Sequence, residues 1–177
     1  MLSNLFVKAA PANASLPWRR ALVTGASAGI GEAIAGRLAA GGCDLVLVAR
    51  REDRLVALAD RLSASGGTSC ELLVADLCTP AGLAAVEQRL AEAGEGAIDL
   101  LVNNAGIGTS GAFADLAIES HLDQIELNVT ALVRLTHAAL GQMRGRRAGA
   151  VMNVSSLATY LPAPTSATYA ASKAFVT

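Results

Sequence analysis

The fold of this 177-residue chain is decided by the stretch Thr24-Gly25-Ala26-Ser27-Ala28-Gly29-Ile30-Gly31. This stretch follows the apolar run Ala21–Thr24 and opens a segment with helical spacing at Ile30–Ala40. Glycines in such a turn let backbone N–H groups and the positive end of the helix dipole approach a phosphate, because no Cβ blocks the way. We therefore interpret it as the first β-α turn of a dinucleotide-binding fold, although its spacing is G-x-x-x-G-x-G rather than the usual G-x-G-x-x-G.

The rest of the chain alternates between short apolar runs and longer segments with helical spacing. The apolar runs are Ala21–Thr24, Leu45–Ala49, Leu72–Ala75, Leu100–Val102 and Val151–Val154. The helical segments are Ile30–Ala40, Asp53–Ser63, Pro80–Ala93 and a long one from Ile118 to Met143. Continuous apolar runs indicate strands covered on both faces, and their alternation with helices indicates parallel β-α-β units. The sequence predicts an α/β fold with a doubly wound parallel sheet, a Rossmann fold in three α/β/α layers.

Several helix ends carry their own signals. Thr79-Pro80 predicts the start of the third helix, with proline in its first turn. Asp53 is expected to cap or open the second helix, and Asp76 is an alternative cap ahead of the third. The pairs Gly41-Gly42 and Gly66-Gly67 predict helix ends that need a left-handed residue.

Composition excludes several classes of protein. Apolar residues make up 53% of the chain and charged residues 16%, which excludes intrinsic disorder. The formal charge is −1 and basic residues form only short Arg pairs, so we expect no nucleic-acid partner. No apolar run approaches the roughly 18 residues of a membrane span, and a cytoplasmic location is expected by default. Residues 1–17 are expected to be a flexible extension and residues 18–177 an NAD(P)-binding domain that is incomplete at its C-terminus.

Two other kinds of site are not expected. His121 and His137 are interpreted as surface or packing residues. With two distant histidines and three scattered cysteines, which are expected to be reduced, the chain predicts no metal site. Ser155 and Ser156 lack the G-x-S-x-G surroundings of a hydrolase nucleophile.

The residue after the second strand bears on the choice of dinucleotide. An acid there binds the ribose 2′-hydroxyl of NAD, whereas an arginine accommodates the 2′-phosphate of NADP. Arg50 therefore predicts NADP over NAD, since its guanidinium presents a fork of donors. Asp76, at the end of the third strand, is expected to accept a hydrogen bond from the adenine amino group.

The most informative chemistry lies in Tyr169-Ala-Ala-Ser-Lys173, with Ser156 thirteen residues upstream. A separation of four places Tyr169 and Lys173 on one face of a helix. A phenol has a reference pKa of about 10 and is a poor acid or base at neutral pH, but a neighbouring ammonium favours its ionised form. With the Ser156 hydroxyl holding the substrate oxygen, these groups would move a proton on and off a carbonyl oxygen.

Taken together, these motifs resemble those of the classical short-chain dehydrogenases/reductases, from about Arg20 to the last residue. The matching motifs, in chain order, are Thr24–Gly31, Asp76-Leu77, Asn103-Asn104-Ala105-Gly106, Asn128, Ser156 and Tyr169-x-x-x-Lys173. The resemblance implies an NAD(P)-dependent oxidoreductase that transfers hydride between NADP(H) and a small-molecule carbonyl or alcohol. It also implies a homo-oligomer for the full-length enzyme.

The resemblance assigns roles to individual residues. Tyr169 would be the general acid/base, and Ser156 rather than Ser155 would polarise the carbonyl. Lys173 would lower the pKa of the phenol and hold the nicotinamide ribose. Asn128 would anchor a water in the proton relay, with a satisfied core asparagine as the alternative. The implied cofactor-binding residues are Gly25, Ser27, Ala28, Gly29, Ile30, Gly31, Arg50, Asp76, Leu77, Asn104, Ala105, Gly106, Tyr169 and Lys173.

Two departures from the family pattern shape the expectations. The sequence stops four residues past Lys173, where family members continue to two further strands and a substrate loop. We therefore expect a C-terminally truncated fragment whose fifth strand is an exposed edge, and an inactive dinucleotide-binding or interaction module is the alternative function. Ala28 stands where many NADP-preferring relatives carry a basic residue, which leaves Arg50 without a second cation. Epimerases and dehydratases of the extended relatives are less favoured, because they lack Asn103-Asn104-Ala105-Gly106.

Overall fold

Five parallel strands form one sheet in the computed structural model, which describes residues 16–160 and 164–177. The strands are β1 (Arg20–Thr24), β2 (Asp44–Ala49), β3 (Cys70–Val74), β4 (Leu100–Asn103) and β5 (Ala150–Asn153). Their order is β3-β2-β1-β4-β5, and each neighbouring pair is parallel. The predicted doubly wound sheet is thereby confirmed, and the five apolar runs fall on the five strands.

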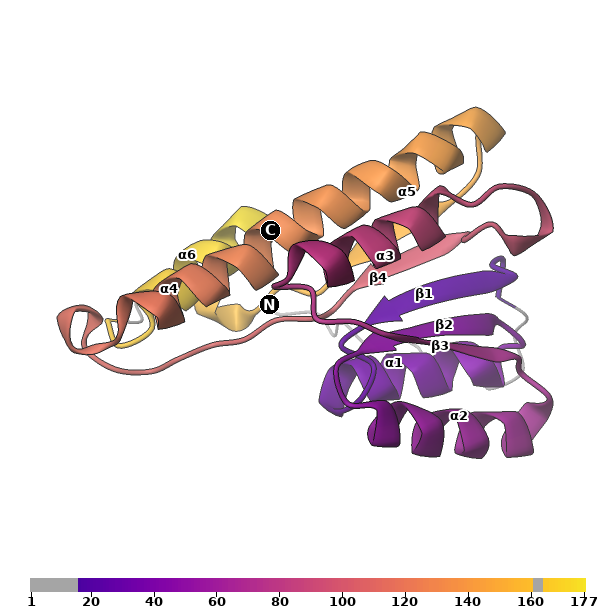
Figure 1. The fold of residues 1–177 in the computed structure, drawn as a ribbon, viewed down its shortest axis with the longest axis horizontal. Coiled ribbons are helices and arrows are strands. Elements are labelled where there is room, and N and C mark those ends of the chain that lie inside the picture. The colour runs from indigo at the N-terminus through magenta and orange to yellow at the C-terminus, as the bar shows by residue number, and fades with distance from the viewer. Residues whose placement is uncertain (1–15, 161–163) are drawn as a thin grey trace, which may run out of the picture.

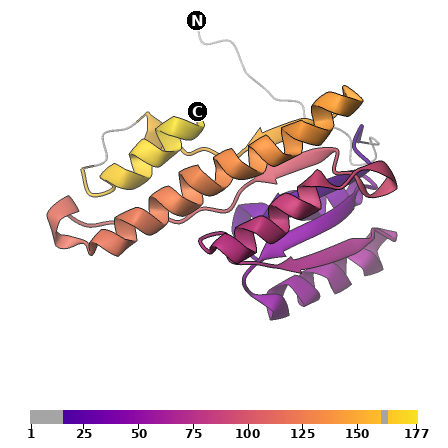
Figure 2. The same ribbon diagram turned by 45° about the horizontal axis from the view of Figure 1, so that its top comes forward.

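Helices cover both faces of this sheet (Figure 1). The helices are α1 (Gly29–Ala40), α2 (Glu52–Gly66), α3 (Pro80–Ala91), α4 (Ile118–Ile125), α5 (Leu132–Arg146) and α6 (Ala167–Val176). α1 and α2 lie on one face, and α3 and α5 lie on the other. Turning the molecule shows α4 and α5 as one long rod with α6 beside its outer end (Figure 2).

Alternate side chains of each central strand point to opposite faces of the sheet and pack into the two halves of the core, one on each face. In β1, Val23 packs with the α1 and α2 side chains, whereas Leu22 packs with those of α3 and α5. Both are fully buried, as are Leu47 and Val46 of β2. Burying a Leu or Val side chain contributes about 1.5–3 kcal/mol, so this doubly covered sheet supplies the main stabilisation of the fold. Leu16 and Trp18 pack against the α1/α2 side, while residues 1–15 of the predicted extension lie outside the described part of the chain.

The ends of the helices mostly follow their sequence signals. The Thr79 hydroxyl caps α3 by accepting the Gly82 amide at 3.1 Å, with Pro80 as the first helical residue. Asp76 therefore does not cap α3; its carboxylate accepts the Cys78 amide instead. Gly67 ends α2 in the left-handed conformation, at φ +72°. Arg51 occupies the cap position of α2, which places Asp53 inside the first turn.

The long helical segment that begins at Ile118 differs from the prediction of one continuous α-helix. The segment Glu126–Ala131, between α4 and α5, is π-helical. A π turn inserts one residue and changes which side chains face inward, and such turns are frequent at functional sites. Apolar periodicity did not reveal it, because the buried side chain at its centre is the polar Asn128.

The strand at the far edge of the sheet, β5, pairs only with β4 within the described residues. Met152 and Asn153 of this strand are exposed. The expectation that the fifth strand forms an edge of the sheet is thus confirmed for the described part of the chain.

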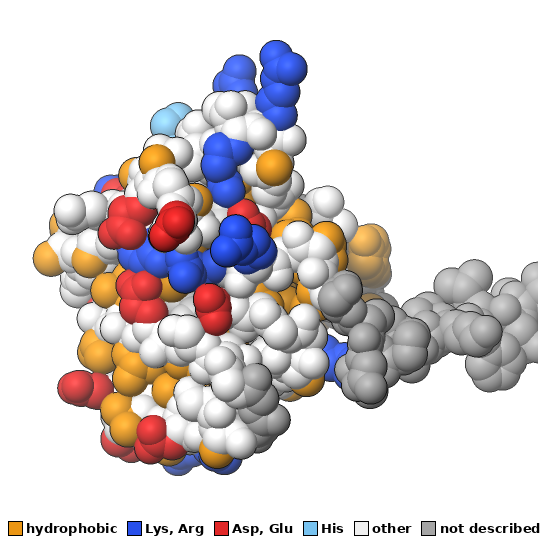
Figure 3. All heavy atoms as spheres, turned by 90° about the vertical axis from the view of Figure 1, so that its right-hand side faces the viewer, with side chains coloured by type: hydrophobic (Ala, Val, Ile, Leu, Met, Phe, Trp, Pro, Cys, Tyr) orange, Lys and Arg blue, Asp and Glu red, His pale blue; other side chains and the backbone are white. Residues whose placement is uncertain are grey.

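Charged pairs gather at the amino ends of the strands, the end of the molecule that faces the viewer in Figure 3. Arg20 pairs with Asp44 at 3.4 Å and Arg146 with Asp99 at 2.9 Å. The buried Arg89 pairs with Glu71 at 2.9 Å. These ion pairs join β1 to β2, α3 to β3, and α5 to the residue before β4.

Asp99 makes the stability of this end of the molecule depend on pH. Burial alone would raise its pKa, but hydrogen bonds from the Arg146 side chain and from the Arg19 and Arg20 amides outweigh burial and lower the pKa. A carboxyl whose pKa is lower in the folded state stabilises the fold above its unfolded pKa of about 4. That stabilisation is lost as the pH falls through the folded pKa.

We therefore expect Asp99→Asn to lower the free energy of unfolding at pH 7 by about 1–3 kcal/mol, since hydrogen bonds to a charged acceptor are lost. The variant should also lose less stability than the wild type on acidification below pH about 4. Urea unfolding across pH measures both effects. Asp60→Asn, which removes an exposed carboxylate of α2, is the matched control. An acid limb of Asp99→Asn identical to that of the wild type would contradict the role of Asp99.

Candidate functional site

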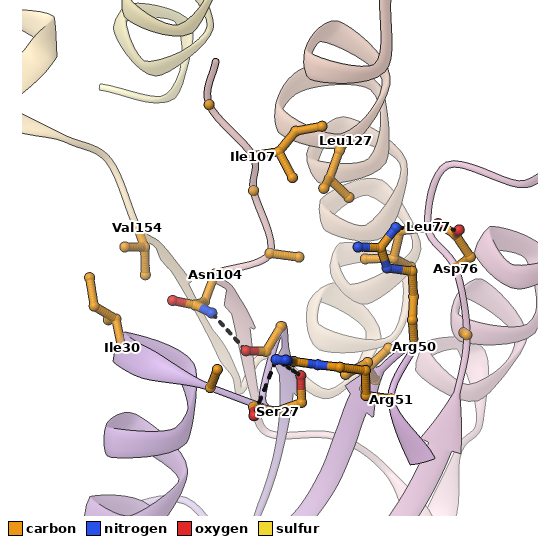
Figure 4. Close-up of a pocket in the computed structure, with 18 of the residues that line it drawn as sticks. Ser27, Ile30, Arg50, Arg51, Asp76, Leu77, Asn104, Ile107, Leu127 and Val154 are labelled. Carbon is orange, nitrogen blue, oxygen red and sulfur yellow. Dashed lines mark hydrogen bonds and ion pairs between the residues drawn. The ribbon is translucent and has the colours of Figure 1, made fainter. Parts of the chain in front are cut away.

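A cavity of about 610 Å³ opens at the carboxyl ends of the central strands (Figure 4). Its lining comes from four places: the glycine turn after β1, the ends of β2 and β3, the loop after β4, and α6 with the end of β5. In parallel α/β sheets this crevice, where the strand order reverses, is the expected ligand site. Here the reversal falls between β1 and β4.

The glycine turn has the backbone that its sequence predicts. Gly25 and Gly29 have φ of +65° and +60°, which other residues rarely adopt. Gly31 has no such φ, but a Cβ there would lie 2.4 Å from the Gly25 carbonyl oxygen and from Asn104 Nδ2. Each of the three positions therefore has a steric requirement for glycine. Ser27, Ala28 and Ile30, which lie between these glycines, line the cavity.

Asn104 braces this turn from the neighbouring strand. Its Nδ2 donates to the Thr24 carbonyl at 2.9 Å and to the Gly25 carbonyl at 3.3 Å. In return, the Thr24 hydroxyl accepts the amides of Asn104 and Ala105, both at 3.0 Å. The motif Asn104-Ala105-Gly106 thus fixes the ends of β1 and β4 relative to each other, and all three residues also line the cavity.

Two arginines follow β2 and line the same cavity. Arg50 is largely exposed, with its Nη1 3.8 Å from Asp76 Oδ2. Arg51 reaches across to the glycine turn, where its Nη2 donates to the Ser27 hydroxyl at 3.1 Å (Figure 4). Arg51 was not among the predicted cofactor-binding residues, although its place beside Arg50 at the strand end was a usable signal.

Tyr169 and Lys173 lie one helical turn apart on α6, and both line the cavity. The Lys173 side chain is buried, with its Nζ donating to the Val154 carbonyl at 2.8 Å and lying 6.0 Å from the centre of the Tyr169 ring. Burial lowers the pKa of Lys173, because the ammonium is partly removed from water. The predicted pair therefore shares one cavity with the glycine turn.

The two serines after β5 are placed differently. Ser155 lines the cavity, and its hydroxyl donates to the Lys173 carbonyl at 3.0 Å. Ser156 is absent from the lining; its hydroxyl accepts the Ala158 amide at 3.2 Å and so caps the short 3₁₀ turn Leu157–Thr159. Among the described residues, the structure thus brings Ser155, and not Ser156, to the cavity.

Asn128 stands in the π-helical segment and is 2% exposed. Its Oδ1 accepts the Ile107 amide at 2.9 Å, and its Nδ2 donates to the Ile107 carbonyl at 2.8 Å and to the Ser172 hydroxyl at 2.9 Å. These are the bonds of a satisfied core asparagine that joins the loop after β4 to α6. The water-anchoring role stays a prediction.

Other residues with possible chemistry lie away from the cavity lining. His137 is exposed on α5, whereas His121 is buried beneath the start of α6. Within residues 16–160 and 164–177, no three His, Cys, Asp or Glu side chains are placed to hold a metal ion. The same residues contain no helix with the length and apolar character needed to cross a membrane.

The glycine turn, the strand-end basic pair and the Tyr–Lys pair thus lie together at one edge of a parallel sheet. Residues 19–177 match the family model of the short chain dehydrogenases. The chain belongs to this family.

Individual relatives agree with this assignment. Nodulation protein G of Rhizobium meliloti is 41% identical over 159 residues, which cover 90% of this chain and 63% of that protein. A short-chain dehydrogenase from Sphingobium yanoikuyae, solved in complex with NADPH, is 46% identical with a TM-score of 0.85, covering 89% of this chain and 60% of that one. A bulky-bulky ketone specific alcohol dehydrogenase from Comamonas testosteroni is 40% identical with a TM-score of 0.85, covering 92% and 64%. The chain thus spans less than two thirds of the length of these relatives.

Proposed function

We propose that the whole protein transfers hydride between NADP(H) and a carbonyl or alcohol carbon, with Tyr169 as general acid/base. The observation that carries this proposal is the shared cavity, which Tyr169 and Lys173 line together with the glycine turn and two arginines. The NADPH complex of the Sphingobium relative supports the choice of cofactor. The family match does not favour the alternative of a non-catalytic module.

The residues of the cavity fit a dinucleotide. Gly29, the first residue of α1, has open space where a Cβ would stand, and no side chain caps that terminus, so it is accessible to a pyrophosphate. Leu77 and Ala105 would flank the adenosine, and Lys173 would hold the nicotinamide ribose. When bound, the nicotinamide gives or takes the hydride.

The proton would move through the hydroxyl of Tyr169. During reduction this hydroxyl would donate its proton to the carbonyl oxygen, and during oxidation the phenolate would accept the proton of the alcohol. Lys173 places a positive charge beside the phenol, and charge at this position stabilises the negative charge that develops on the two oxygens. The Ser156 hydroxyl would polarise the carbonyl, since the Ser155 hydroxyl is bonded to the Lys173 carbonyl and to the Thr177 hydroxyl.

The proposal is tested by mixing the whole natural protein with NADPH and a panel of ketones and aldehydes, and following NADPH absorbance. Consumption of NADPH that depends on the carbonyl compound supports it. A protein that binds NADPH in a fluorescence titration but reduces none of the panel, and oxidises none of the matching alcohols with NADP, would contradict the catalytic part.

Preference for NADP is proposed to come from Arg50 and Arg51 together. Both guanidinium groups line the cavity beside the end of β2, where the adenosine ribose lies in this fold. Arg51, whose bond to Ser27 holds it over the glycine turn, would supply the second cation that Ala28 lacks.

We expect Arg50→Asp to shift preference toward NADH, lowering the ratio of kcat/KM for NADPH to that for NADH by roughly 10-fold to 100-fold. This range corresponds to the loss of one charge-assisted hydrogen bond to a 2′-phosphate. Steady-state kinetics with both nucleotides measure the ratio. Arg54→Asp makes the same charge change on the exposed face of α2 and should leave the ratio near that of the wild type. An unchanged ratio in Arg50→Asp would remove Arg50 from nucleotide discrimination.

A homo-oligomer is proposed for the whole protein. Support comes from apolar side chains that α4 and α6 leave exposed: Ile118, Leu122, Ile125 and Phe175. Large exposed apolar patches commonly mark interfaces between chains. Sedimentation of the natural protein measures its oligomeric state.

A further inference from the structure

His121 makes contacts that the proposed chemistry does not use. It belongs to α4, is 6% exposed, and both ring nitrogens have partners. Nδ1 lies 2.7 Å from the Thr168 hydroxyl, and Nε2 lies 3.1 Å from the Phe113 carbonyl oxygen. The ring also stacks on that of Phe113, with 4.3 Å between the ring centres. One side chain therefore joins α4, the loop after β4 and the first turn of α6.

The two contacts define which nitrogen carries the proton. A carbonyl oxygen only accepts, so Nε2 must donate to Phe113. In the neutral ring, Nδ1 then accepts, and the Thr168 hydroxyl is its donor. This assignment satisfies both nitrogens without another partner, as a buried imidazole requires.

Thr168 occupies a sensitive position on α6, since it immediately precedes Tyr169. Ser166, at the cap position of α6, makes no side-chain capping bond. The first turn of α6 is therefore held from the side, through Thr168. One turn further along, the Ser172 hydroxyl bonds to Asn128 in the same way.

These bonds fix the orientation of the whole helix. Thr168 and Ser172 are four residues apart and share one face of α6, which bonds to α4 and the π-helical segment. Tyr169 and Lys173 share the adjacent face, which lines the cavity. Rotation of α6 would have to break both lateral bonds.

We propose that His121 is a positioning residue, which holds the Tyr169 end of α6 against the loop after β4 through Thr168 and Phe113. The catalytic consequence rests on the proposed function, whereas the contact itself does not. The loop matters because Gly108, five residues before Phe113, packs against the Tyr169 ring, where an added Cβ would lie 3.0 Å from it. Without the His121 bonds, both the loop that contains Gly108 and the end of α6 that contains Tyr169 could move at this contact.

The test compares His121→Phe, which keeps the stacked ring, with Thr168→Val, which replaces only the hydroxyl. Each should lower kcat about 10-fold to 100-fold, the cost of a displacement of about 1 Å, while KM for NADPH stays unchanged. The double variant should lose no more than the worse single variant, because both substitutions remove the same bond between His121 and Thr168. Thr168→Ser should recover wild-type kcat, and His137→Phe, at an exposed histidine, is the control. Additive losses, or an unchanged kcat in both single variants, would overturn the proposal.

A second measurement is independent of turnover. Nitrogen-15 NMR of the natural protein should show His121 with Nε2 protonated and Nδ1 unprotonated. Thr168→Val should shift the Nδ1 resonance, because that nitrogen loses its hydrogen-bond donor. Amide hydrogen exchange of Ala170–Lys173 should accelerate at least about 10-fold in His121→Phe and Thr168→Val, because the helix end opens more often. A protonated Nδ1 in the neutral ring, or unchanged exchange, would overturn the bridge even in a protein that reduces no carbonyl compound.

Discussion

Tyr169→Phe is expected to remove most of the carbonyl reduction by NADPH while leaving NADPH binding nearly unchanged. The substitution removes one hydroxyl and keeps the ring that lines the cavity, so the contacts of the nucleotide persist. General acid/base groups contribute about 10²-fold to 10⁴-fold to a rate, and we expect a loss of kcat of that size. Stopped-flow or steady-state NADPH consumption measures kcat, and NADPH fluorescence measures binding.

The chain offers a matched control for this substitution. Tyr160 is its other tyrosine, and its side chain is 72% exposed and outside the cavity lining. Tyr160→Phe deletes the same hydroxyl and should retain the wild-type kcat. If Tyr169→Phe turned over at the wild-type rate, another group would have to move the proton.

Gly31→Ala is expected to damage both folding and cofactor binding. The new Cβ would lie 2.4 Å from the Gly25 carbonyl oxygen and from Asn104 Nδ2, so the turn and its brace must move apart. Overpacking of this kind lowers the free energy of unfolding by about 1–3 kcal/mol. The displaced turn no longer presents its amides to the pyrophosphate, and the Kd for NADPH should rise at least about 10-fold. Urea unfolding and NADPH titration measure the two effects.

Gly36→Ala is the control in the same helix. A Cβ at Gly36 meets its nearest described neighbour, Leu62 Cδ2, at 4.0 Å, which is ordinary contact. Alanine is favoured over glycine inside a helix by about 1 kcal/mol, so this variant should be at least as stable as the wild type and bind NADPH equally well. If the two alanine variants had the same free energy of unfolding and the same Kd for NADPH, the close contacts around Gly31 would contribute to neither quantity.

Much of the architecture could be predicted from the sequence because its signals are local. Strands buried on both faces read as continuous apolar runs, and Thr79-Pro80 contains the cap and the first helical residue of α3. The glycine turn was placed correctly because its backbone conformation and close contacts require glycine at fixed positions. The π-helical segment was not predicted, since its hydrogen-bond shift leaves no periodic signature around Asn128.

The details of the site depend on contacts between distant residues, which a sequence read in isolation does not show. Arg51 reaches Ser27 only because β1 and β2 are neighbours in the sheet. Ser155 and Ser156 are adjacent and identical, so only the course of the chain after β5 decides which of the two residues lines the cavity. His121 was interpreted as a surface or packing residue, and the sequence gives no sign of its bond to Thr168, which lies 47 positions away.

The ion pairs around Asp99 and Arg89 and the nucleotide cavity stand at opposite ends of the same strands. Heat tolerance and reactivity are therefore adjustable by separate sets of substitutions in this protein. Substitutions among the ion pairs could raise thermal stability without changing the residues that line the cavity.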